Sequence, residues 1–156
     1  MTRAETLLHR ARAAGVWLAT AESCTGGLIA AAITEVPGSS EVFDRGFVTY
    51  SNGAKTDMLG VPPASIARCG AVSEEVAIAM AEGALLRSNA TLAVAVTGVA
   101  GPGGSEQKPE GMVCFCVAQT GRSAVAETMQ FGALGRAQVR AATVDYALDL
   151  LIGRLS

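Results

Sequence analysis

The stretch VWLATAESCTGGLIAAAI, residues 16–33, decides the fold, because it passes from a buried strand through a tight turn into a helix. Its first apolar run predicts a strand over residues 15–20, and the run after the glycines predicts a helix over 26–35. Ser23 lies in the turn between them, so we expect it at a helix N-terminus, among free backbone N–H groups and the positive end of the helix dipole. That setting suits an anion, or a nucleophile that forms an oxyanion.

The alternation of strands and helices continues along the chain. Further helices are predicted over residues 3–14, 52–59, 73–87 and 134–155, and further strands over 46–50, 92–96, 111–118 and 123–131. Proline and glycine predict breaks at 37–40 and 61–63 and a long loop over 97–110. This order predicts one α/β domain over residues 1–156, a three-layer α/β/α sandwich whose mixed, mostly parallel sheet includes an antiparallel hairpin from the last two strands.

Composition narrows the class of protein. Half of the 156 residues are apolar, only 4% are aromatic, and the net charge is −2. A nucleic-acid-binding surface would need a basic patch, and the sequence has no basic run. It also has no apolar stretch near the ~18 residues of a membrane span, and its start lacks the apolar core of a signal peptide. We therefore expect a soluble cytoplasmic protein that binds neither nucleic acid nor membrane.

The cysteines and the single histidine do not have the spacing of a metal site. The four cysteines are Cys24, Cys69, Cys114 and Cys116, and the only histidine is His9, in a polar helix. A zinc site would need a CxxC-type pair or histidine partners. We interpret Cys114 and Cys116 as small buried residues on one face of a strand, and we expect no metal and no cofactor.

Three polar segments follow predicted strands, namely 22–27, 50–55 and 97–104. In an open α/β sheet the ligand site lies beyond the carboxyl ends of the strands, so these segments are expected to converge. A Ser-His-Asp triad is excluded there, because His9 lies on the wrong element. A serine nucleophile would need another base, and a lysine whose pKa is lowered by burial or by nearby cations can serve.

The chain has only two lysines, Lys55 and Lys108, and ten arginines. Arginine cannot act as a base at neutral pH, which leaves the lysines. Each candidate also has a simpler interpretation. Ser23 could be only a helix cap, Tyr50 a packing residue and Lys55 a solvated helix residue.

Two further features could bind a phosphate. The loop 97–105 is rich in glycine and could cradle a phosphate with its backbone N–H groups, or it could be a plain mobile loop. It has neither the P-loop nor the dinucleotide-binding spacing. Arg136 and Arg140 are four residues apart on one predicted helix face. Either could clamp a phosphate or carboxylate, or both could belong to a solvated basic face.

Taken together, the motifs resemble one family. ESCTGG at 22–27, GSS at 38–40, GFVTYSN at 46–52, GAVS at 70–73 and TGVAGP at 97–102 occur in this order, with Lys55, Lys108-Pro109 and Gly111 at their expected places. They resemble the CinA C-terminal domain family over roughly residues 5–152. That family includes stand-alone nicotinamide-nucleotide amidases. The resemblance implies hydrolysis of the carboxamide of nicotinamide mononucleotide to nicotinate mononucleotide and ammonia, without a metal.

The resemblance also assigns roles by position. Ser23 matches the nucleophile, and Lys55 with Tyr50 matches the pair that activates it. Thr97 matches a residue that positions the substrate, with Gly98 beside it, and Arg136 matches an arginine on the phosphate side. Backbone N–H groups of Cys24, Thr25, Gly26 and Gly27 would hold the oxyanion. A homodimer or higher homo-oligomer is expected. The alternative is a competence- or damage-inducible nucleotide-binding module with little catalysis.

Overall fold

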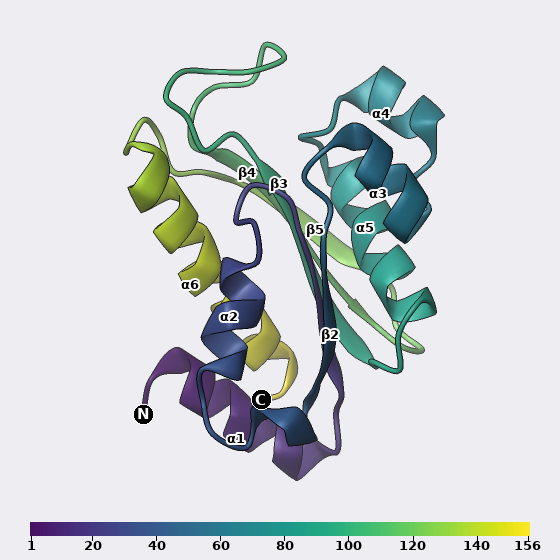
Figure 1. Ribbon diagram of the computed structural model, residues 1–156, viewed down its shortest axis with the longest axis vertical. Helices are drawn as coiled ribbons and strands as arrows, with labels where there is room; N and C mark the ends of the chain where they lie inside the picture. The colour runs from purple at the N-terminus through teal and green to yellow at the C-terminus, as the bar shows by residue number, and fades with distance from the viewer.

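A five-stranded sheet forms the centre of the computed structural model, which describes residues 1–156 (Figure 1). The strand order is β2-β1-β3-β4-β5. The strands are β1 Leu18–Glu22, β2 Phe43–Val48, β3 Leu92–Gly98, β4 Met112–Gln119 and β5 Val125–Gln130. β1 pairs in parallel with β2 and β3, whereas β4 is antiparallel to both β3 and β5. Four strands thus point the same way and only β4 is reversed, which confirms the mixed, mostly parallel sheet.

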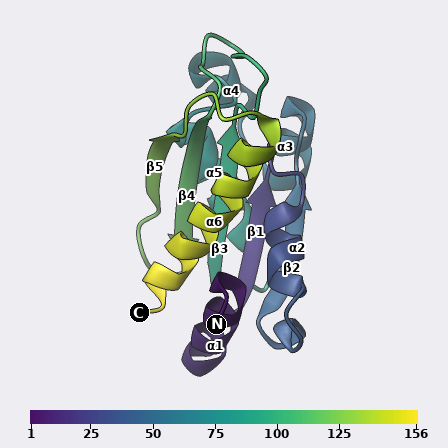
Figure 2. The ribbon, with the colours of Figure 1, turned by 90° about the vertical axis from the view of Figure 1, so that its left-hand side faces the viewer.

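Helices cover both faces of this sheet, as the three-layer prediction requires (Figures 1 and 2). The helices are α1 Arg3–Ala14, α2 Leu28–Thr34, α3 Asn52–Leu59, α4 Pro63–Cys69, α5 Glu74–Leu86 and α6 Arg136–Arg154, with one 3₁₀ turn, η1 Ser39–Glu41. α1, α2 and α6 lie on one face, and α3, α4 and α5 lie on the other. None of the helices combines the length and the apolar character that crossing a bilayer requires.

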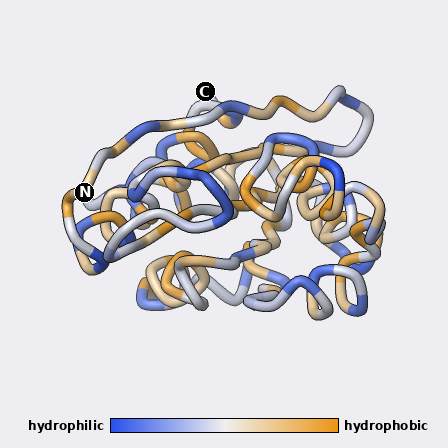
Figure 3. The backbone as a smooth tube through the Cα atoms, turned by 90° about the horizontal axis from the view of Figure 1, so that it is seen from above, coloured by the Kyte–Doolittle hydropathy of each residue, from blue (hydrophilic) through white to orange (hydrophobic).

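The two faces of the sheet carry side chains of different size, because successive residues of a strand point to opposite sides. Toward α1, α2 and α6, the central strands present large residues: Leu92, Val94, Val96, Val113, Phe115 and Val117. Toward α5 they present small ones: Ala93, Ala95, Cys114, Cys116 and Ala118. Cys114 and Cys116 are buried and free, as expected. Seen from above, many of the hydrophilic stretches lie at the outer rim of the molecule (Figure 3).

Several predicted boundaries were wrong. The first strand runs to Glu22 rather than ending at residue 20, and β2 begins at Phe43 rather than at residue 46. The strand predicted over 92–96 continues to Gly98, so Thr97 and Gly98 belong to β3 and not to a loop. Helix α4 was missed, because Pro62-Pro63 suggested a break. Pro63 instead occupies the first helical position, where a missing N–H costs nothing.

The register of the parallel strands fixes where the site lies. Glu22 at the end of β1 pairs with Val48 of β2 and with Val96 of β3. The residues that follow Glu22 and Val48 therefore leave the sheet at the level of Thr97 and Gly98, the last two residues of β3. Ser23 and Thr97 are brought to one edge together with the segment that contains Lys55, which confirms the expected convergence.

Candidate functional site

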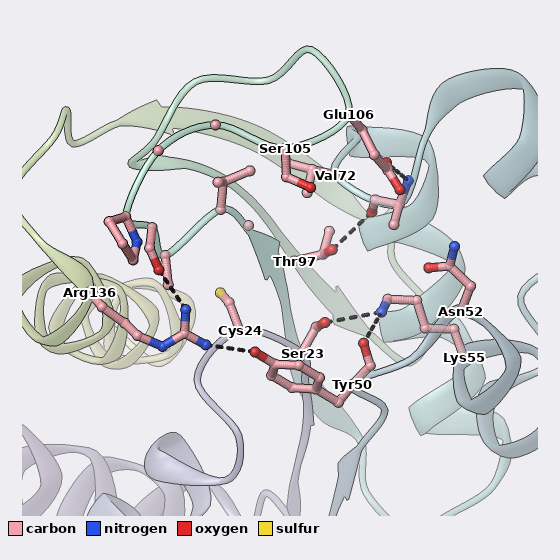
Figure 4. Close-up of a pocket in the computed structure, with 18 residues that line it drawn as sticks. Ser23, Cys24, Tyr50, Asn52, Lys55, Val72, Thr97, Ser105, Glu106 and Arg136 are labelled. Atoms are coloured by element: carbon pink, nitrogen blue, oxygen red, sulfur yellow. Dashed lines mark hydrogen bonds between the residues drawn. The ribbon is translucent and has the colours of Figure 1, made fainter.

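A cavity of about 310 Å³ opens at this edge of the sheet. Most of the residues singled out in the sequence line it: Ser23, Cys24, Tyr50, Lys55, Thr97, Gly98 and Arg136. Figure 4 labels all of them except Gly98 around the space, where they are contributed by the ends of β1 and β3, the start of α3 and the start of α6. The loop 99–106 closes the cavity on the side opposite to Tyr50 and Lys55.

Lys55 is buried against Ser23. Its Nζ atom donates to Ser23 Oγ at 3.0 Å, to the Thr49 carbonyl at 2.9 Å and to the Tyr50 carbonyl at 3.3 Å. Only 1% of Lys55 is exposed. The side chain of Ser51 caps α3 by accepting from the N–H of Ala54, which places Lys55 on the first turn, at the cavity wall.

Burial lowers the pKa of Lys55 below its usual value, because the charged form loses its hydration. The negative charge of Glu106 opposes this shift in part. None of the protein's ion pairs involves Lys55. At a given pH, a larger fraction of Lys55 is therefore neutral than of a solvated lysine. A neutral amine can accept the proton of the serine hydroxyl.

Cys24 also faces the cavity, next to Ser23 (Figure 4). Burial raises the pKa of its thiol to about 11. Because the thiolate is the nucleophilic form of cysteine, Cys24 remains an unreactive thiol near neutral pH. Of the two neighbouring candidates, the electrostatics favour Ser23.

The expectation of free N–H groups holds for Cys24 and Thr25 in the turn after Ser23, but it is wrong for the first turn of α2. The carboxylate of Glu22 occupies that position, fully buried. It accepts from the Ile29 N–H at 2.9 Å, the Ala30 N–H at 3.0 Å and the Thr25 hydroxyl at 2.6 Å. Glu22 is the last residue of β1, so its side chain points to the α2 face while Ser23 points toward Lys55. The helix N-terminus thus binds an anion that belongs to the protein.

The turn between Ser23 and α2 is fixed by backbone contacts. The N–H of Gly26 donates to the Ser23 carbonyl at 3.0 Å, and Gly26 and Gly27 have φ of 58° and 105°, which glycine adopts readily. The N–H groups of Cys24 and Thr25 donate to no protein acceptor. Thr25, Gly26 and Gly27 were expected to contact substrate, but the structure places them outside the cavity lining.

Tyr50 contacts Lys55 through its backbone carbonyl and not through its hydroxyl. The hydroxyl accepts from Arg136 Nη2 at 2.7 Å, and Arg136 Nη1 donates to the Gly101 carbonyl at 2.6 Å. Arg136 thereby links the start of α6 to both sides of the cavity (Figure 4). The sequence placed Tyr50 beside the serine–lysine pair, whereas the structure places its hydroxyl beside the arginine.

The second arginine of the pair has a different environment. Arg140 does not line the cavity. Its guanidinium donates from Nε to the Cys24 carbonyl at 3.1 Å and from Nη2 to the Thr25 carbonyl at 3.2 Å. Only Arg136 is therefore in a position to meet a ligand in the cavity.

Thr97 and Gly98 lie at the end of β3, as part of the cavity wall. The Thr97 hydroxyl donates to the Ala71 carbonyl at 2.8 Å, which ties β3 to the segment before α5. A Cβ on Gly98 would stand 2.7 Å from the side chain of Val113 and 3.0 Å from the Met112 carbonyl, so only glycine fits. Lys108, the other candidate lysine, does not line the cavity.

Four lining residues were not singled out from the sequence: Asn52, Ala71, Val72 and Glu106. Asn52 lies inside the quoted motif GFVTYSN, and Ala71 and Val72 lie inside GAVS, which was the available signal. Glu106 lies in the long loop and its carboxylate accepts from the Ala71 N–H at 3.3 Å. No sequence pattern indicated it. The chain contains no cluster of three or more histidine, cysteine or carboxylate side chains that could hold a metal ion.

Comparison with solved structures identifies proteins of the same fold and length. A competence/damage inducible protein, CihA, from Agrobacterium tumefaciens is 49% identical with a TM-score of 0.91, covering 98% of this chain and 96% of that one. A CinA superfamily protein from Escherichia coli is 37% identical with a TM-score of 0.91, covering 97% and 89%.

Comparison with curated proteins finds longer relatives. A CinA-like protein of Mycobacterium marinum is 52% identical over 140 residues, which are 89% of this chain and 33% of that protein. A putative competence-damage inducible protein of Symbiobacterium thermophilum is 62% identical over 109 residues, 69% of this chain and 26% of that protein. The matched part thus spans about a quarter to a third of these relatives. The family model of the CinA C-terminal domain matches residues 1–155, and the chain belongs to that family.

Proposed function

We propose that this protein is an amidohydrolase that converts nicotinamide mononucleotide to nicotinate mononucleotide and ammonia, with Ser23 as nucleophile and Lys55 as base. The observation that carries the proposal is the buried amine of Lys55, 3.0 Å from the Ser23 hydroxyl at the wall of a cavity. Burying a lysine without a carboxylate partner is costly, and a pure binding module would have no use for that cost. In an amidohydrolase the burial is useful, because it lowers the pKa of Lys55 and so favours the neutral amine that acts as the base.

The first half of the reaction forms an acyl-enzyme. In the neutral form, Lys55 keeps its two N–H donors for the Thr49 and Tyr50 carbonyls and its lone pair accepts from the Ser23 hydroxyl. It takes the proton of Ser23 as Oγ attacks the carboxamide carbon. The carbonyl oxygen becomes an oxyanion, and the unengaged N–H group of Cys24, a residue of the cavity wall, is its proposed donor. The C–N bond then breaks, and the Lys55 ammonium returns the proton to the departing nitrogen as ammonia. The positive charge of the pyridinium ring makes the carbonyl carbon more electrophilic.

The second half reverses these proton transfers. Lys55 takes a proton from water, whose oxygen attacks the ester carbon. The bond to Ser23 Oγ breaks, Lys55 returns the proton to Ser23, and the nicotinate mononucleotide leaves. No step needs a metal or a redox partner.

Arg136 is the proposed phosphate ligand. Its guanidinium is exposed on the cavity side and is already oriented by the Tyr50 hydroxyl and the Gly101 carbonyl. A planar guanidinium held in this way can donate two parallel hydrogen bonds to the oxygens of a phosphate. We therefore assign the Tyr50 hydroxyl to the orientation of Arg136 and leave the proton transfer to Lys55.

The deciding experiment is incubation of the purified protein with nicotinamide mononucleotide, with ammonia and nicotinate mononucleotide measured in parallel. The two products must appear in equal amounts and must be absent with Ser23→Ala. If nucleotide binds without ammonia release, the protein is instead the nucleotide-binding module, the role that the competence- and damage-related names of its relatives leave open.

A further inference from the structure

The carboxylate of Glu110 bridges the loop at the cavity wall and the start of α6. Its Oε1 atom accepts from the N–H of Gly103 at 2.7 Å, and its Oε2 atom accepts from the N–H of Gly135 at 3.0 Å. Gly103 lines the cavity, and Gly135 directly precedes Arg136, the first residue of α6. One side chain thus holds both of the segments that Arg136 connects.

The loop has few other ties at this point. Residues 100–104 make only two hydrogen bonds to the rest of the protein. One is the bond to Glu110, and the other runs from Arg136 to the Gly101 carbonyl. A Cβ on Gly101 would stand 2.5 Å from the Cδ atom of Glu110, so the Glu110 side chain lies directly against the residue whose carbonyl Arg136 contacts. The place of that carbonyl relative to α6 therefore depends on Glu110.

Glu110 does this without neutralising Arg136. None of the protein's ion pairs involves either residue, and each Glu110 oxygen is instead taken by a backbone N–H. A carboxylate also suits the start of a helix, where the dipole is positive. The guanidinium keeps its charge for a ligand, while its direction is fixed by the Gly101 carbonyl and the Tyr50 hydroxyl (Figure 4).

We propose that Glu110 is a positioning residue for Arg136, which fixes the loop against α6 so that the guanidinium is held ready for a phosphate. This inference rests on the proposed function, in which the ligand is a mononucleotide and Arg136 binds its phosphate. It concerns the preference for a nucleotide over the corresponding nucleoside. Such preorganisation adds affinity, because an arginine that is already ordered loses less freedom on binding.

The preference for a phosphate can be measured without turnover. In a Ser23→Ala background, the dissociation constants of nicotinamide mononucleotide and of nicotinamide riboside are compared by calorimetry. Arg136→Met should weaken binding of the nucleotide about 10- to 100-fold, the size of one lost charge-assisted contact, and leave the riboside within about twofold. Glu110→Ala should give the same pattern with a smaller loss for the nucleotide, about 5- to 30-fold.

The combination of Glu110→Ala with Arg136→Met tests whether Glu110 acts through the arginine. If it does, the combination should bind the nucleotide less than about twofold more weakly than Arg136→Met alone, because no guanidinium is left to position. Glu127→Ala is the matched control. This carboxylate is also hydrogen-bonded, to the Tyr146 hydroxyl, but it lies outside the cavity lining, so neither dissociation constant should change.

Glu110→Gln separates positioning from charge, and it also serves if the alanine variant does not fold. The amide keeps the size of the side chain but has only one acceptor oxygen for the two N–H groups. Positioning therefore predicts weaker binding of the nucleotide, by about 3- to 10-fold. A carboxylate that merely repelled the phosphate would predict the opposite result, tighter binding once its charge is removed.

Tighter binding of the nucleotide by Glu110→Gln would overturn the inference. Wild-type affinity, an equal loss for nucleotide and riboside, or additive losses in the combined variant would overturn it as well. So would equal affinity for nucleotide and riboside before Glu110 is changed, because there would be no phosphate contact to position. Failure of the proposed hydrolysis has a separate sign, the absence of ammonia release by the wild-type protein, and the binding comparison still decides the role of Glu110.

Discussion

Ser23 Oγ and Lys55 Nζ lie 3.0 Å apart, although 32 positions separate the two residues in the sequence. The parallel pairing of β1 with β2 brings the strand ends together, and the Ser51 cap begins α3 immediately afterwards. The pair is therefore built from rigid elements, which suits a proton transfer that needs a short, constant distance.

Ser23→Ala should abolish ammonia release and leave the fold intact. Loss of a serine nucleophile costs several orders of magnitude in kcat, and we expect at least ~10³-fold here. The rate is measured by ammonia release under saturating nucleotide, and folding by circular dichroism and thermal unfolding.

Cys24→Ala is the matched control for this prediction, since the two residues are adjacent and both line the cavity. The high pKa of the Cys24 thiol predicts that its removal changes kcat only slightly. Inactivation by Cys24→Ala together with activity in Ser23→Ala would move the nucleophile to the cysteine.

Removal of metal ions should leave the activity unchanged. The residues around the cavity include no cluster with the donor set of a metal site, and the proposed steps use only Ser23, Lys55 and backbone N–H groups. Dialysis against EDTA followed by a rate measurement checks this. A stoichiometric zinc whose removal stops the reaction and whose return restores it would contradict the serine–lysine mechanism.

Glu22→Gln should destabilise the protein, because it removes the anion from the start of α2. The amide keeps one acceptor oxygen but presents an NH₂ group to a backbone N–H, and it loses the attraction of the helix dipole. An unsatisfied buried donor costs ~1–3 kcal/mol and a partly buried charge at a helix end is worth up to ~2 kcal/mol, so we expect ~2–4 kcal/mol.

The free energy of unfolding of Glu22→Gln is measured in urea, with Glu35→Gln as control. Glu35 lies exposed just past the other end of α2 and has no comparable contacts, so its change should be within ~0.5 kcal/mol. Equal stability of Glu22→Gln and the wild type would show that the carboxylate does not stabilise the turn.

The fold could largely be predicted from the sequence, because alternating strands and helices with glycine-rich turns constrain the topology. Ser23, Lys55 and Thr97 could be placed at one edge for the same reason. The role of Glu22 could not be predicted, because the predicted strand ended at residue 20. Without Glu22 in the strand, the alternation of side chains could not show which face of the sheet Glu22 points to. The partner of the Tyr50 hydroxyl depends on α6, which is far away in sequence, and no local pattern reports such a contact.

The last prediction concerns Lys55 as the base. Lys55→Arg keeps the positive charge but cannot accept a proton near neutral pH, so it should lose about as much activity as Lys55→Met, ~10²–10⁴-fold or more. If Lys55 only attracted the phosphate, arginine would substitute well, because it binds phosphate bidentately. One conservative change thus gives opposite results for the two roles.

The pH profile tests the same residue independently. Burial lowers the pKa of Lys55, and the base must be neutral, so the rate should rise with pH and level off above that lowered pKa. In Lys55→Arg this rising limb of the pH profile should vanish, because the guanidinium stays charged over the whole pH range. With a base of ordinary lysine pKa, ~10.4, the rate would level off only above that pH, whereas with the buried lysine it should level off earlier. If the rising limb persists unchanged in the residual activity of Lys55→Arg, another group is the base and the mechanism proposed for Ser23 is wrong.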